Sequence, residues 1–326
     1  MLEIFTEWLV FNVFKLNAET RLGEALHFFI YDSIKIILLL FVMIAIVGFL
    51  RTYIPPEKIK KWLSKGKFGI SNLFASLFGA ITPFCSCSSI PLFLSFIKAG
   101  VPLGVTFSFL ITSPLVNEYL VVLMWGFFGW KITAAYVVFG ILIGVFAGII
   151  LGKMKLEKHL VKDMINKVKT KAKKAKAEKL QTYKTFMDRI NFGIKEAVSI
   201  TKKLWLWVIV GVAIGAGIHN FVPEATIQAI IFKGGIFTVP IATLLGVPMY
   251  GSCAAIVPIA VVLFQKGIPL GTALAFMMAT AALSLPEAII LRRAMKLRLI
   301  LIFFAIVTVG IIIVGYLINF LQGWLV

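Results

Sequence analysis

The sequence has little of what a secreted domain or a nucleotide-driven machine requires. Only three of its 326 residues are cysteine and three are histidine, while Asp and Glu together number 14. Three cysteines cannot form a disulfide framework, so no oxidising compartment is implied. The phosphate-binding pattern G-x-x-x-x-G-K-[ST] is absent, so this chain must depend on an ion gradient or a partner subunit for energy. The N-terminus also lacks a signal-peptide pattern, and we expect an interfacial helix there.

Apolar residues are abundant instead. They make up 60% of the chain, and the mean hydropathy is +0.99, which lies outside the range of soluble globular domains. Several windows with almost no charge are long enough to cross a hydrocarbon core of about 30 Å. These windows cover residues 34–50, 103–128, 132–152, 204–221 and 299–320. The sequence therefore predicts an all-α polytopic membrane protein, placed in the plasma membrane.

The formal net charge of +19 comes largely from one segment. Sixteen Lys and Arg residues lie between positions 153 and 203, in a segment that includes the Lys/Ala-rich run KVKTKAKKAKAEKL. No aromatic or glycine-rich motif of the kind that binds nucleic acid accompanies them. Such a run is typical of a cytoplasmic linker that contacts anionic lipid headgroups. We predict lipid contact there and no nucleic-acid partner.

The chain resembles itself when it is shifted by 167 positions. Gly48 then aligns with Gly215, Gly79 with Gly246, and the run GVPLG at 100–104 with GIPLG at 267–271. Glycine and proline fix backbone geometry, so their coincidence indicates two copies of one fold unit. We expect an interfacial helix over 1–31, a first membrane repeat over 32–152, a basic linker over 153–198 and a second repeat over 199–326.

The distribution of basic residues predicts the topology. We expect each repeat to make about three full crossings and to carry one re-entrant hairpin of two short helices, the first of them within residues 68–97. An odd number of crossings inverts the second repeat relative to the first. This arrangement places 27 of the 33 Lys and Arg residues on the cytoplasmic side. Inverted repeats with discontinuous helices are typical of secondary transporters.

The hairpin tips carry all three cysteines. The first tip reads TPFCSCSS (82–89) and the second PMYGSCAA (248–255). A buried cysteine is often only a small apolar side chain, but three at two facing tips suit a soft ion better. A disulfide within C-x-C would be strained, and structural zinc needs four ligands. The candidate solute ligands are Cys85, Cys87 and Cys253, with Ser86, Ser88, Ser89, Ser252 and Pro83 around them.

Two acidic residues lie in apolar surroundings. Glu118 follows Pro114 and Asn117, and Glu287 follows Pro286 directly. The two prolines predict a helix break beside each carboxylate. A carboxylate deep in the membrane is costly, so it should face a cavity or carry a proton. We predict that both carboxylates shape or couple the transport pathway, with Asn117 as a further binding candidate. The alternative is that each carboxylate caps a broken helix end.

Glycine also recurs every four residues at positions 140, 144, 148 and 152. Close helix packing explains this period without any further function.

The motif TPFCSCSSIPLFLSFIKAGVPLGVTFSFLITSPLVNEY, with its weaker copy in the second half, resembles the signature of the DUF318 (UPF0718) permeases, the family of the organoarsenical efflux permease ArsP. The resemblance covers both repeats and implies an inner-membrane permease. Some family members export trivalent organoarsenicals with the help of paired cysteines, and others are linked to copper or zinc. The matching motif places these cysteines at Cys85 and Cys87, and less directly at Cys253.

Together these features predict a permease that exports a thiophilic solute, most directly a trivalent arsenical or organoarsenical, without a cofactor. A copper or zinc exporter and a transporter of small sulfur-containing metabolites are alternatives of the same class. A thiol-redox membrane enzyme is less favoured, because no basic residue adjoins Cys85 in the sequence to stabilise a thiolate. A passive channel is also less favoured, because channels usually form their filter through oligomeric symmetry, whereas this chain carries its own internal repeat. The prediction is compatible with a homo-oligomer.

Overall fold

The computed structural model describes residues 2–13, 20–52, 69–82, 86–154, 156–160, 185–221, 235–249, 253–292 and 295–325. Every element in these ranges is a helix, which confirms the all-α prediction. Three helical stretches are long and apolar enough to cross a membrane, judged by length and composition among the described residues. They are Glu118–Lys153, Leu270–Leu291 and Leu297–Leu325.

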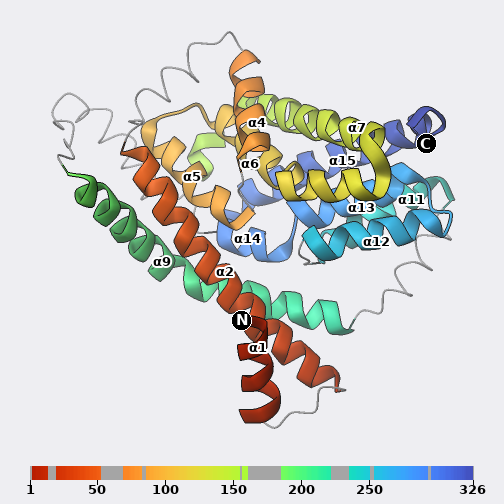
Figure 1. Ribbon diagram of the computed structural model, residues 1–326. Coiled ribbons are helices and arrows are strands. Elements are labelled where there is room, and N and C mark those ends of the chain that lie inside the picture. The colour runs from red at the N-terminus through yellow and green to blue at the C-terminus, as the bar shows by residue number, and fades with distance from the viewer. Residues whose placement is uncertain are drawn as a thin grey trace.

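In the described ranges, the first half contains seven elements (Figure 1). They are α1 (Leu2–Glu7), the π-helix η1 (Trp8–Val13), α2 (Arg21–Arg51), α4 (Ile70–Ile81), α5 (Ser86–Ala99), α6 (Leu103–Leu115) and α7 (Glu118–Lys153). The pair of short helices predicted within residues 68–97 is present as α4 and α5.

The second half follows a similar order. It contains η2 (Leu156–His159), α9 (Phe186–Phe221), η3 (Gly235–Phe237), α11 (Thr238–Gly246), α12 (Cys253–Gln265), α13 (Leu270–Ala282), α14 (Leu285–Leu291) and α15 (Leu297–Leu325). The helices α6 and α13 both have 13 residues, and their first residues are 167 positions apart. The residues Gly100 and Gly267, also 167 apart, have positive φ angles of 80° and 87° in the turns that precede these helices.

The apolar window at 103–128 is not one helix. Helix α6 ends at Leu115, Val116 has extended backbone angles (φ −128°, ψ 94°), and α7 begins at Glu118. The other half has the same kind of break between α13 and α14. These breaks confirm the interruptions predicted beside Pro114 and Pro286. A second change of direction occurs within α7 at Gly129, whose φ of 79° and ψ of 173° are not helical. Figure 1 shows the two parts of α7 folded back on each other at this point.

Glycines allow α6 and α7 to pack closely. A Cβ on Gly104 would lie 2.6 Å from the carbonyl oxygen of Gly148, and one on Gly148 would overlap Ser108 Oγ. The contact recurs between α13 and α15, where a Cβ on Gly271 would overlap the carbonyl oxygen of Gly315. The packing role predicted for the glycine period in α7 is therefore confirmed.

The helices α2 and α9, the first long helix of each half, lie side by side (Figure 1). A Cβ on Gly193 would lie 2.5 Å from the carbonyl oxygen of Ala45, and the rings of Phe49 and Phe186 are 5.5 Å apart. This pair contacts the remaining helices through α5, which packs on α2, and α14, which packs on α9.

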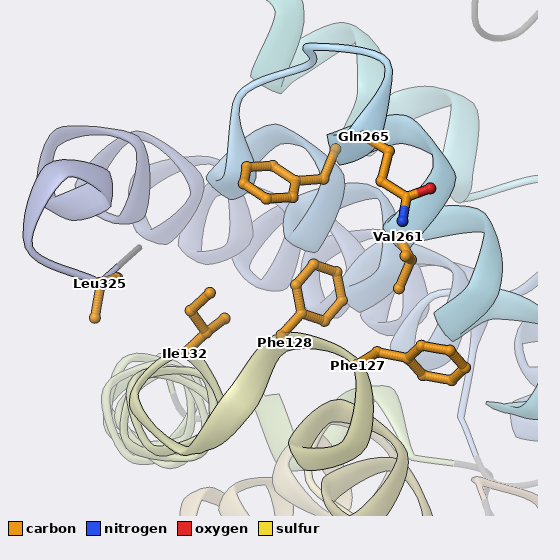
Figure 2. A pocket seen from close by; sticks show the side chains of 7 residues that line it. Phe127, Phe128, Ile132, Val261, Gln265 and Leu325 are labelled. Carbon is orange, nitrogen blue, oxygen red and sulfur yellow. The ribbon is translucent and has the colours of Figure 1, made fainter.

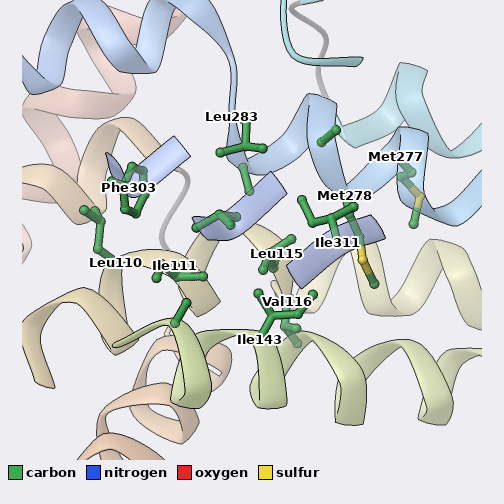
Figure 3. Close-up of a cluster of buried hydrophobic side chains, with 14 of the residues drawn as sticks. Leu110, Ile111, Leu115, Val116, Ile143, Met277, Met278, Leu283, Phe303 and Ile311 are labelled. Carbon is green, nitrogen blue, oxygen red and sulfur yellow. The ribbon is translucent and has the colours of Figure 1, made fainter. Parts of the chain in front are cut away.

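The core lies where the two halves meet. Side chains from α6, α7, α13 and α15 form one buried cluster in which Leu110, Leu115, Met277 and Ile311 are at most 1% exposed (Figure 3). The aromatic ring of Phe107 stacks on that of Phe303 with their centroids 5.6 Å apart. Both halves contribute to this main cluster. A smaller cluster belongs to the first half alone and consists of Ala75, Leu92, Phe96, Val101, Val105 and Phe109.

Candidate transport site

The part of α7 after the bend at Gly129 is its long arm. The break between α6 and α7 lies near the middle of this arm. Gly104 lies beside Gly152, and Val116, at the end of α6, lies beside Gly140. Gly140 precedes Gly152 by 12 residues, which corresponds to about 18 Å at 1.5 Å per residue. Helix α6 therefore starts at the Lys153 end of α7 and stops about halfway along a hydrocarbon core of about 30 Å.

The hairpin of α4 and α5 begins and ends at the Lys153 end of α7. Gly69, which precedes α4, lies beside Ile149, and the residues after α5 lead directly into α6. With 12 and 14 residues, α4 and α5 are about 18 and 21 Å long, too short to cross the core. The end of α4 and the start of α5 are therefore about 20 Å away from that end.

The hairpin of α11 and α12 is connected to the opposite end of the molecule. Helix α13, which follows α12, begins where Asn319 and Gln322 of α15 accept hydrogen bonds from the Gly271 and Leu270 amides at 2.7 and 2.9 Å. Near this end of α15, Leu325 lies close to Phe128 and Ile132 at the bend of α7. The two hairpins are thus connected to opposite ends of the molecule.

The structure describes the predicted thiol site in part. Pro83, Cys85 and Ser252 lie outside the described residues, as do the side chains of Ser86, Cys87, Ser88 and Cys253. The backbones of Cys87 and Cys253 lie in the first turns of α5 and α12. Ser89, also in the first turn of α5, is fully buried. The start of α5 and the start of α12 are again 167 residues apart, at Ser86 and Cys253.

Asn117 caps a helix. It has extended backbone angles at the N-cap of α7, and its Oδ1 accepts a 2.8 Å hydrogen bond from the Leu120 amide. The side chain is 9% exposed. The backbone amides at a helix N-terminus lack intrahelical partners, and an Asn side chain satisfies one of them. Asn117 therefore stabilises the resumption of the helix after the break.

The two predicted carboxylates lie in equivalent first turns but in different surroundings. Glu118 is the first residue of α7 and is exposed. Glu287 lies in the first turn of α14 and is only 1% exposed, because α14 packs against α9 and approaches α5. A carboxylate near a helix N-terminus interacts favourably with the helix dipole, and this holds for both residues.

Comparison with known proteins shows the family to which the chain belongs. The sequence pattern of the ArsP_1 family, described as a predicted permease, matches residues 21–320. The chain belongs to this family. It is therefore a membrane permease rather than a soluble protein, in agreement with the predicted resemblance.

The relatives of this permease are distant. Two are UPF0718 proteins: MJ0584 of Methanocaldococcus jannaschii is 22% identical and covers 76% of this chain and 81% of its own length, and YcgR of Bacillus subtilis is 21% identical and covers 87% and 93%. A Streptococcus mutans protein, named as a subunit of a two-component membrane permease complex, is 26% identical over 62% of this chain and 65% of its own length. No solved structure matches the chain.

Sequence reasoning missed a buried carboxylate in this permease. Asp32 of α2 is 6% exposed, and its neighbour Ser33 is 7% exposed. An acidic residue two positions before an apolar window could have signalled this burial.

Sequence reasoning also missed a buried group of polar side chains between α4 and α6, which we call the polar seam. There Asn72 Nδ2 donates a 2.9 Å hydrogen bond to Ser108 Oγ, and Thr112 Oγ1 donates to the Ser108 carbonyl at 2.9 Å. The signal for the seam was the four-residue spacing of Ser108 and Thr112, which matches the glycine period of α7.

Proposed function

We propose that this permease is a secondary transporter that exports a thiophilic solute from the cytoplasm, and that the solute is a trivalent arsenical or organoarsenical. The solute would bind reversibly between the two hairpin tips, with Cys85, Cys87 and Cys253 as ligands. Soft thiolate ligands favour soft, thiophilic ions over hard cations. The observation that supports this proposal is that Cys87 and Cys253 lie in the first turns of two short helices, α5 and α12, whose hairpins are connected to opposite ends of the molecule.

The proposal includes an inverted repeat. Its support is the coincidence of α6 with α13 and of the starts of α5 and α12 at a separation of 167 residues. The Gly104–Gly148 contact and the Gly271–Gly315 contact follow the same separation. In a transporter of this design the two copies exchange conformations, so that a central site opens first to one side and then to the other.

We place the energy coupling at Glu287. A carboxylate that is 1% exposed in a membrane protein is costly unless it is protonated or satisfied, so its charge state should respond to the pathway beside it. Its helix, α14, contacts α5, whose first turn carries Cys87. Glu118, which is exposed, is the weaker candidate.

The remaining proposals concern location and partners. We place the permease in the plasma membrane with the basic segment between α7 and α9 in the cytoplasm, where its lysines contact anionic lipids. The name of the Streptococcus mutans relative makes a partner subunit a further proposal, tested by affinity purification from the native membrane.

Uptake into inverted membrane vesicles tests the thiol site. The measured solutes are methylarsenite, arsenite, Cu(I) and Zn(II), with the wild type and with Cys85→Ser, Cys87→Ser and Cys253→Ser. We expect methylarsenite uptake to fall at least tenfold in Cys85→Ser and Cys87→Ser. Ser199→Ala, an exposed position on α9, is the control. Serine variants that transport every solute at the wild-type rate would refute the proposed site. If the serine variants lose only Cu(I) or only Zn(II) uptake, that metal and not an arsenical is the solute.

A further inference from the structure

A cavity of about 260 Å³ lies at the bend of α7 (Figure 2). Phe127, Phe128 and Ile132 line it from α7, and Val261, Phe264 and Gln265 line it from α12, with Leu325 of α15 at its edge. The rings of Phe128 and Phe264 are 6.1 Å apart. Along α12, Cys253 precedes Phe264 by 11 residues, or about 17 Å, so this helix leads from the cavity to the second hairpin tip.

The corresponding residues in the other half are buried. A shift of 167 residues converts the cavity-lining Phe128, Ile132, Val261 and Phe264 into a set with no residue more than 9% exposed. The set consists of Met295, Leu299, Leu94 and Ile97. The two halves therefore differ here: Phe128, Val261 and Phe264 at the cavity are partly exposed, whereas all four counterparts are buried in the core, at what we call the packed end.

A short segment packs against the packed end. Residues 156–160, which we call the strap, leave the end of α7 and pack against the start of α15. Leu156 and Leu160 are each 5% exposed, and Leu160 forms an antiparallel bridge with Met295. The Lys296 amide donates a 2.9 Å hydrogen bond to the His159 carbonyl oxygen, and Lys296 Nζ lies 3.5 Å from the Lys158 carbonyl oxygen.

The cavity and the strap are a membrane thickness apart. Ile132 lines the cavity, and Leu151, also in α7, lies just before the strap. The 19 residues between these positions span about 29 Å of helix, close to the hydrocarbon core of about 30 Å. The first turns of α5 and α12 lie between the two ends, about 20 Å from the strap end and about 17 Å from the cavity respectively. The strap lies at the start of the basic linker, so its end of the molecule is the linker side.

We propose that the cavity between Phe128 and Phe264 is the open mouth of the transport path and that the strap closes the path on the linker side. This inference rests on the proposed transport function and adds its direction: the structure is open on the side opposite the linker. Release of the strap from Met295 and Lys296 would then be the step that admits a cytoplasmic solute. The cavity is lined mainly by aromatic and aliphatic side chains with one amide, at Gln265, so it suits an uncharged solute better than a free metal cation.

The native cysteines report on both openings. A membrane-impermeant maleimide is added to the full chain in right-side-out or in inverted vesicles, and the labelling rate of Cys85, Cys87 and Cys253 is measured by mass spectrometry. In the wild type we expect labelling from the cavity side and little from the linker side. Labelling that is equal from both sides in the wild type would contradict a closed strap.

Lys296→Pro tests the strap, because proline removes the amide that donates to His159. Its matched control is Lys296→Ala, which keeps that amide and removes only the Nζ contact. We expect Lys296→Pro to raise the linker-side labelling rate about fivefold over Lys296→Ala, the population change that corresponds to one hydrogen bond. Leu160→Ala, which leaves the backbone intact, should act in the same direction. Linker-side rates in both Lys296→Pro and Leu160→Ala that equal the control rate would refute the strap as the closure.

Val261→Trp tests the mouth by filling the cavity. Its control is Val262→Trp, because Val262 is 38% exposed and does not line the cavity. We expect slower labelling from the cavity side in Val261→Trp than in Val262→Trp, and equal rates would refute the mouth. These measurements need no transported solute. If labelling is as expected but the serine variants transport normally, this inference stands and the thiol site is rejected. If the serine variants lose transport but labelling differs from the expectation, only this inference is rejected.

Discussion

Tyr136 Oη donates a 2.7 Å hydrogen bond to the carbonyl oxygen of Leu115, at the point where α6 ends. Both side chains are fully buried, and the bond joins the long arm of α7 to the broken helix. The last carbonyl groups of a helix have no intrahelical partners and need an external donor. A tyrosine from a neighbouring helix therefore stabilises the interruption on which the proposed site depends.

Tyr136→Phe should destabilise the protein by removing this donor while keeping the ring. Hydrogen bonds between membrane helices contribute about 0.6 kcal/mol on average, with a maximum of about 1.7 kcal/mol. We expect a loss of about 1 kcal/mol, measured as a lower midpoint of thermal unfolding in detergent. Tyr119→Phe, at a position that is 52% exposed, should leave the midpoint unchanged. Equal midpoints for the two variants would show that the bond contributes nothing.

Gly104→Ala should separate α6 from α7. The new Cβ would lie 2.6 Å from the Gly148 carbonyl oxygen and 2.7 Å from the Gly152 Cα, and both are backbone atoms that cannot rotate away. Overpacking of this kind costs about 1–3 kcal/mol. Gly126→Ala is the control, because a Cβ there meets nothing within 4 Å, and alanine favours a helix. Thermal unfolding should show a lower midpoint for the first variant and an equal or higher one for the second.

Asn117 was predicted as a binding residue, and its observed bond to the Leu120 amide supplies a structural explanation. Asn117→Ala should cost about 1 kcal/mol of stability, the usual effect of losing an N-cap, whereas Asn117→Ser should retain the cap. Unfolding midpoints and methylarsenite uptake should be measured on both variants. If Asn117→Ser unfolds like the wild type but has lost transport, the amide contacts the solute as well as the helix.

The helix breaks were accessible to sequence reasoning because they depend on local chemistry. Pro114 and Pro286 each disfavour a continuous helix, and the four-residue glycine period in α7 required a close neighbour. These features depend on residues close together in the chain, so one sequence suffices to predict them.

The difference between Glu118 and Glu287 was not accessible in this way. Both carboxylates follow a break and begin a helix, so their local sequences predict the same role. The burial of Glu287 depends on α14 packing against α9, a helix that ends more than 60 residues earlier in the chain. The Asn72–Ser108 bond likewise joins two helices whose pairing is a tertiary feature. The spacing of Ser108 and Thr112 marks a polar face of α6, but no local pattern identifies Asn72 as its partner.

The burial difference between these carboxylates makes a prediction about coupling. Glu287→Gln removes the ionisable group from a site that is 1% exposed and keeps the shape of the side chain. If Glu287 carries the coupled proton, transport by this variant should become insensitive to an imposed pH gradient, because the amide cannot bind or release a proton in the same range. Glu118→Gln changes an exposed side chain and should keep the wild-type sensitivity. The measurement is methylarsenite uptake into inverted vesicles with and without a pH gradient at constant membrane potential. Glu287→Gln that responds to the gradient like the wild type would remove Glu287 from coupling, and a loss of response in Glu118→Gln alone would transfer the role to the first half of the molecule.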